Sequence, residues 1–251
     1  MRPDVLDLKA YYSSPLGAPT IDALCACLPS FKAGERVLAV GYGLPLLSRL
    51  ARGCERIVAA MPARQGAIAW PAGPKEANQV CLVDVEDLPF VDALFDHIVF
   101  IHCLEFTGRV STALREASRA LAPAGQIHII VPNRVGPWCR AESTPFGNGR
   151  PFSSGQLERL MEEAHLAPLS WHMALMLPPI GSLARWMNRW EKIGQRLWST
   201  FGGVYVVSAK KELFRRRPNA PATAHHRPIR IPALQPAAAL APALDKIKHC
   251  S

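Results

Sequence analysis

The sequence has no apolar run that approaches the ~20 residues needed for a membrane-spanning helix. Its first residues include Arg2, Asp4, Asp7 and Lys9, where a signal peptide would keep its apolar stretch. These two absences predict a cytoplasmic protein without an integral membrane segment.

Several motifs that carry chemistry are also missing. The sequence contains no GxSxG elbow, HExxH pair, phosphate-binding P-loop or paired-carboxylate motif, so nothing favours a hydrolase, a metalloprotease or an NTPase. The seven cysteines are odd in number and scattered, which argues against a disulfide framework. Cys25 and Cys27 form the only close pair, and no second Cys or His pair lies at ligand spacing, so we expect no metal site.

Charge is distributed unevenly along the chain. From Lys210 onward there are nine Lys and Arg against two acids, so most of the net charge of +9 lies there. Beyond Phe214 the sequence has six prolines, alanine runs and no periodicity, which is typical of disorder. We therefore predict a globular domain over 1–214 and a disordered basic tail over 215–251, which would make at most weak, salt-sensitive contact with nucleic acid or anionic lipid.

Short apolar runs alternate with segments of helical spacing over the first 210 residues. The expected strands lie in the runs at 36–43, which ends in glycines, and at 56–61, 80–84, 95–102, 126–131 and 203–209. The expected helices cover 20–28, 46–52, 63–69, 109–121, 156–165 and 183–198. Alternating strands and helices imply right-handed crossovers, so we expect a doubly wound α/β fold with a mostly parallel sheet.

Three segments carry a resemblance to a known family: ValLeuAlaValGlyTyrGly at 37–43, the AspLeuProPhe-containing stretch at 82–96, and the AlaProAlaGly-containing stretch at 114–127. In this order and spacing the chain resembles the class I S-adenosylmethionine-dependent methyltransferases of the type 11 kind, with a degenerate glycine motif. The resemblance implies a Rossmann-like, seven-stranded sheet and S-adenosylmethionine as cofactor.

The resemblance also implies which residues meet the cofactor. The glycine turn would approach its methionine part, Asp84 and Val85 would recognise the adenine ring, and His102 would lie near the methyl group. The implied cofactor-binding residues are Gly41, Tyr42, Gly43, Met61, Asp84, Val85 and His102.

The sequence departs from the family pattern at three positions. Ala39 and Met61 stand where the family has acids, and Pro45 stands at the third glycine. The acid at position 61 would hold the ribose hydroxyls through charge-assisted hydrogen bonds, each worth about 1.5–3 kcal/mol. Two functions therefore stay open: a methyltransferase acting on an unknown substrate, or a catalytically inactive methyltransferase-fold scaffold or regulatory protein.

His102 is the one candidate for a catalytic base, with Glu105 to orient it, although a histidine that ends an apolar strand is commonly structural. The loop over 133–152 is long and rich in polar and aromatic residues, so it is either a substrate lid or a packed surface loop. Tyr11 and Tyr12 either cover the pocket or simply pack. A small molecule, a lipid and a protein side chain all remain possible methyl acceptors. The candidate substrate residues are Asn133, Arg134, Phe146 and Arg150.

Overall fold

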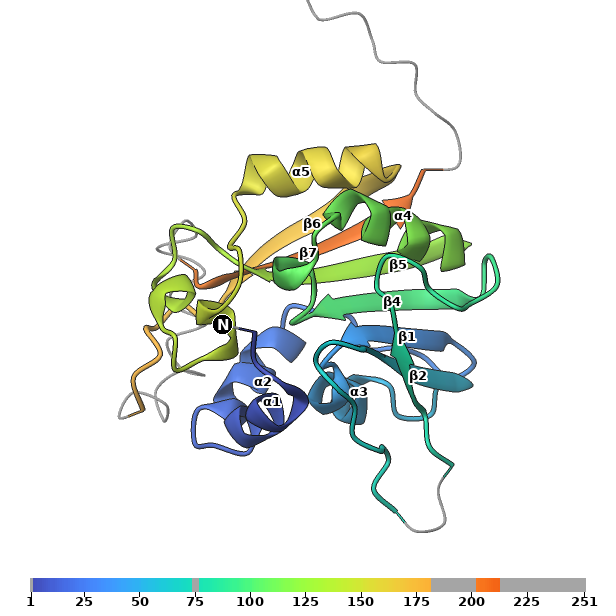
Figure 1. Cartoon of the computed structure of the whole chain (residues 1–251). Helices are drawn as coiled ribbons and strands as arrows, with labels where there is room; N and C mark the ends of the chain where they lie inside the picture. The colour runs from blue at the N-terminus through green and yellow to red at the C-terminus, as the bar shows by residue number, and fades with distance from the viewer. Residues whose placement is uncertain (1, 74–76, 182–201, 213–251) are drawn as a thin grey trace, which may run out of the picture. The chain divides into compact units, whose positions relative to one another are not determined.

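Among residues 2–73, 77–181 and 202–212, which the computed structural model describes, seven strands form one sheet in the order β3-β2-β1-β4-β5-β7-β6 (Figure 1). All described residues belong to a unit that spans Met1–Arg215. The strands are β1 (Arg36–Gly41), β2 (Arg56–Pro62), β3 (Val80–Val83), β4 (Phe95–Ile101), β5 (Leu121–Pro132), β6 (Leu166–Ala174) and β7 (Val204–Lys211). The helices are α1 (Val5–Tyr12), α2 (Gly17–Cys25), α3 (Leu44–Leu50), α4 (Val110–Ala120) and α5 (Ser154–Glu163), with 3₁₀ turns η1 (Leu104–Phe106), η2 (Pro137–Arg140) and η3 (Pro145–Gly147).

The sheet is parallel from β3 through β5, and β7 runs antiparallel to both β5 and β6. Strand order reverses between β1 and β4, which makes this point the topological switch of the sheet. The predicted doubly wound, Rossmann-like, mostly parallel fold is confirmed.

The central strands are mostly apolar because both of their faces are covered. In β1, Val37 and Ala39 pack with the apolar residues of α1, α2 and α3, whereas Leu38 and Val40 pack with those of α4 and α5. Successive side chains of a strand point to opposite faces, so a strand between two helical layers has no polar side. Figure 1 shows the two groups of helices on opposite sides of the sheet.

One predicted helix is absent from the structure, and another lies outside the described residues. The helix predicted over 63–69 is wrong, because these residues form turns: the Gln65 amide bonds back to the Pro62 carbonyl, and Gly66 has a left-handed φ of +84°. The Gln65 side chain is buried and reaches another strand end, which fixes the turn. The helix predicted over 183–198 and the tail predicted over 215–251 lie outside the described residues.

The periodicity did not indicate two of the observed elements. One is α1, which begins with a capping box between Asp4 and Asp7. The other is β6, the edge strand beside β7. No helix in the described part of the chain is long and apolar enough to cross a membrane.

Candidate functional site

The carboxyl ends of four parallel strands meet at the switch point of the sheet. Gly41 ends β1, Pro62 ends β2, Val83 ends β3 and Ile101 ends β4. Open α/β sheets bind their ligands in the crevice outside these ends. The predicted cofactor residues follow or end these strands, except Met61, which is the last residue but one of β2, so the topology brings them to one edge.

The turn after β1 requires its two glycines. Gly41 has a φ of +97°, and a Cβ there would collide with the carbonyl oxygen of Ile101 on the adjacent strand. A Cβ on Gly43 would lie 2.5 Å from the Cβ of Ala39. Close packing of the backbone against β1 and β4 is therefore enough to explain both glycines. Pro45 lies in the first turn of α3, where a missing N–H costs nothing.

Helix α1 covers this turn with an aromatic side chain. The Tyr12 ring stacks on Tyr42 with the centroids 5.8 Å apart, and its hydroxyl lies 2.6 Å from Nε2 of His102. Burial raises the pKa of Tyr12 well above its usual value, so the phenol stays protonated in this contact. The other ring nitrogen of His102, Nδ1, lies 3.6 Å from a carboxylate oxygen of Glu105.

His102 is fully buried and its backbone is strained. Its φ is +56°, a left-handed conformation that residues other than glycine seldom adopt. The Gln65 side chain donates to its carbonyl oxygen at 2.7 Å, and the Phe146 ring lies 4.6 Å from the imidazole. Strained backbone of this kind clusters at functional sites. The imidazole itself lines neither of the two cavities described below.

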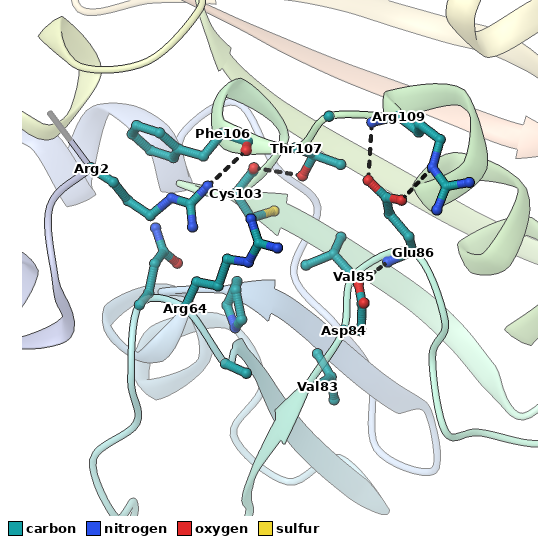
Figure 2. Close-up of a pocket in the computed structure, with 14 residues that line it drawn as sticks. Arg2, Arg64, Val83, Asp84, Val85, Glu86, Cys103, Phe106, Thr107 and Arg109 are labelled. Carbon is teal, nitrogen blue, oxygen red and sulfur yellow. Dashed lines mark hydrogen bonds and ion pairs between the residues drawn. The ribbon is translucent and has the colours of Figure 1, made fainter.

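A cavity of about 430 Å³ opens at the ends of β2, β3 and β4 (Figure 2). Asp84 and Val85, directly after β3, lie in its wall. The Asp84 carboxylate accepts a 2.9 Å hydrogen bond from the Glu86 amide, which fixes the turn. Glu86 in turn binds Arg109 through the guanidinium at 2.7 Å and through the backbone amide at 3.0 Å.

The end of β2 presents no carboxylate to this cavity. Met61 is 1% exposed and packs in the apolar core, while Pro62, Ala63 and Arg64 line the cavity. Ala39 is equally buried beneath the glycine turn. The two positions where acids were expected are thus both core positions in this fold.

Cys103 also lines the cavity, but its thiol is not set up to react. Burial raises its pKa well above the ordinary value, so the reactive thiolate is disfavoured. The thiol instead donates to the Val40 carbonyl at 3.3 Å. Within the described ranges, no group of three or more His, Cys, Asp or Glu side chains could hold a metal ion.

A second cavity of about 530 Å³ adjoins the first, since both are lined by Arg2, Arg64 and Phe106. Arg150 and Glu105 complete its charged groups. Glu105 is 2% exposed, and neither of its carboxylate oxygens has a hydrogen-bond partner.

Comparison with known families identifies the domain. Residues 38–129 match the family model described as a methyltransferase domain, a segment that runs from β1 into β5 and contains most of the first cavity's lining. The chain carries a class I methyltransferase domain. No curated protein matches the sequence.

Solved structures share this methyltransferase fold at low sequence identity. An S-adenosylmethionine-dependent methyltransferase from Thermotoga maritima superposes with a TM-score of 0.56 at 16% identity, over 83% of this chain and 96% of that one. A 1,6-didemethyltoxoflavin N1-methyltransferase from Burkholderia thailandensis, with S-adenosylhomocysteine bound, gives 0.51 at 18% identity, over 82% and 85%. The [4+2]-cyclase SpnF gives 0.55 at 20% identity, over 79% and 82%. Sequence identities of 16–20% show a shared fold but not a shared activity.

The predicted substrate residues of the methyltransferase domain lie in different environments. Asn133 is buried, and its side chain binds Gly202 and Val135 backbone groups. Arg134 binds the Gln156 side chain at the surface, and Phe146 is buried against His102. Of the four, Arg150 alone lines one of the two cavities described above, so their shared role in substrate binding stays a prediction.

Sequence reasoning missed the arginines that line the cavities of the methyltransferase domain. Arg2 precedes α1, Arg64 lies in the turn after β2, and Arg109 precedes α4. Only their positions next to strand ends or next to the covering helix could have drawn attention to them, because no local motif contains them.

Proposed function

We propose that the protein transfers a methyl group from S-adenosylmethionine to an oxygen or nitrogen atom of an acceptor molecule. The observation that carries this proposal is the cavity at the ends of β2, β3 and β4, with Asp84 and Val85 in its wall. It lies beside the switch point, where open α/β sheets hold their ligands, within the segment that matches the methyltransferase family.

The residues of this cavity fit the adenosine half of the cofactor. The Asp84 carboxylate is an acceptor for the adenine amino group, and Val85, which is 6% exposed, offers an apolar contact for the ring. The ribose hydroxyls would meet Pro62 and Ala63 in place of a carboxylate. Loss of two charge-assisted bonds lowers affinity by about two to four powers of ten, so we expect binding in the micromolar range or weaker.

The chain's own residues would contribute to the reaction by positioning and by exclusion of water. S-adenosylmethionine supplies an already activated methyl group. Helix α1 closes the methionine end through the Tyr12 contacts with Tyr42 and His102. The buried His102 then holds Tyr12 in place. Proximity and orientation would account for most of the rate enhancement in such a site.

The alternative is a methyltransferase-fold protein that has lost catalysis and acts as a scaffold or regulator. Two observations favour it: the end of β2 has no carboxylate, and Gly41, Tyr42 and Gly43 line neither cavity.

Calorimetric titration of the full chain with S-adenosylhomocysteine separates the two functions. Ala63 is exposed and lines the cavity, so Ala63→Trp would fill the space without disturbing the core. Ala67 is also exposed but lines neither cavity, which makes Ala67→Trp the matched control. We expect binding to the wild type and to Ala67→Trp, and its loss in Ala63→Trp. A well-folded wild type that binds neither S-adenosylhomocysteine nor S-adenosylmethionine would favour the scaffold. Substitution at Gly41 is unsuitable, because a Cβ there collides with β4.

A further inference from the structure

Arginines from three distant segments line the second cavity. Arg2 comes from the segment before α1, Arg64 from the turn after β2, and Arg150 from the loop before α5. Glu105 is the only acidic residue in the same wall. The cavity therefore carries an excess of positive charge.

These arginines differ from the arginines that stabilise the fold. Arg36 and Arg119 bind carboxylates at 2.7–3.1 Å. Arg2 donates only to the Phe106 carbonyl at 3.0 Å, with its guanidinium 5.7 Å from the centroid of the same residue's ring. In the described part of the chain, the Arg64 and Arg150 side chains have no hydrogen-bond or ion-pair partner. Their charge is thus left available to a ligand.

Arg2 and Arg64 extend toward the same space. Figure 2, which draws the first cavity, shows both guanidinium groups reaching into it, while Arg109 lies apart, bound to Glu86. Two like charges that face one another repel, and an anion between them turns that repulsion into attraction. Planar guanidinium groups bind phosphate and carboxylate through paired hydrogen bonds.

Glu105 also lines this cavity, but its carboxylate is almost fully buried and both oxygens lack a hydrogen-bond donor. Because these oxygens present almost no surface to the cavity, the arginines are the charged groups that a ligand meets there.

We propose that the second cavity binds the methyl acceptor, and that this acceptor is a small anionic molecule. Its phosphate or carboxylate group lies among Arg2, Arg64 and Arg150. Assignment of this molecule as the acceptor rests on the proposed methyltransferase function. The binding of an anion at these arginines does not.

Calorimetric titrations of the full chain at constant ionic strength test the site with defined probes. Glycerol 3-phosphate carries a phosphate and hydroxyl groups, 4-hydroxybenzoate carries a carboxylate and a hydroxyl, and glycerol carries no charge. We expect one or both anions to bind and glycerol not to bind. The tighter of the two anions identifies the head group. We expect Arg64→Gln and Arg150→Gln each to weaken that binding by about tenfold or more.

Arg159 on α5 provides the matched control. It is exposed and lines neither cavity, so Arg159→Gln makes the same charge change and should leave anion affinity as in the wild type. Absence of anion binding, or equal affinity in all three variants, would overturn the proposal.

Titration in the presence of saturating S-adenosylhomocysteine separates this site from that of the cofactor. The proposal predicts that the anion still binds. If S-adenosylhomocysteine abolishes anion binding, the arginines hold the amino-acid end of the cofactor and the proposal is wrong. Anion binding by a chain that does not bind S-adenosylhomocysteine would instead overturn the methyltransferase function and leave the anion site standing.

Discussion

Acidification should destabilise the fold through two histidines that lie side by side on the sheet. His128 on β5 is fully buried, with Nε2 3.2 Å from Nδ1 of His97 on β4 and Nδ1 2.8 Å from the Ser208 hydroxyl on β7. Burial lowers the pKa of His128 to about 3, with a smaller contribution from the charge of His97. Burial also lowers the pKa of His97, although Glu35 opposes the shift.

The sign and size of the effect follow from the His128 pKa. Between pH 6.5 and about pH 3, the unfolded chain takes up a proton at this residue while the folded chain does not. The free energy of unfolding is therefore complete above pH 6.5 and falls as the pH decreases, by up to about 1.4 kcal/mol per pH unit. At pH 5 the loss from His128 alone is about 2 kcal/mol.

Urea unfolding followed by circular dichroism at pH 7 and pH 5 measures this loss. In His128→Leu the difference between the free energies of unfolding at pH 7 and pH 5 should shrink by about 2 kcal/mol, even though the variant is less stable than the wild type at both pH values. His172 on β6 is exposed, so His172→Gln should keep the wild-type difference. A His128→Leu variant with the full wild-type difference would refute the reasoning.

Three substitutions test the packing that supports the site, each by urea unfolding. Gly43→Ala should lower the free energy of unfolding by about 1–3 kcal/mol because the new Cβ meets that of Ala39. The double variant with Ala39→Gly should regain part of this loss. A double variant that regains none of it would contradict this account. Arg119→Met should lower the free energy of unfolding by about 1.5–3 kcal/mol, since it removes donors to main-chain carbonyls and to two carboxylates. A change under about 0.5 kcal/mol would show that these hydrogen bonds do not stabilise the fold. Trp138→Ala should lower the free energy of unfolding by about 3–5 kcal/mol because the indole is fully buried and donates to the Leu177 carbonyl. Trp171→Ala, at the exposed edge of the sheet, should lower it much less.

Much of the fold could be predicted because buried parallel strands leave a strong local pattern. The run at 36–43 and the middle of the run at 95–102 place apolar side chains on both faces, as helical layers on both sides require. The helix predicted over 63–69 failed because its short apolar pattern competed with Gly66 and with a buried Gln65, whose partner is a distant carbonyl. The periodicity of a short segment cannot reveal a hydrogen-bond partner that lies so far away in sequence.

Most of the candidate site that could be predicted follows a strand. Asp84 and Val85 were predicted because they come directly after β3, and they lie in the first cavity. Met61 was predicted at the same edge, but alternation along β2 turns its side chain into the core. Arg150 was predicted from its long loop, whereas Arg2 and Arg64 come from segments that only the tertiary fold brings together, so no sequence spacing contains them.

A crystal structure of the full chain grown with S-adenosylhomocysteine tests the central claim most directly. The account predicts the adenine ring beside Asp84 and Val85, at the ends of β2, β3 and β4. The ligand at any other position, or saturated crystals with this cavity free of ligand, would contradict it.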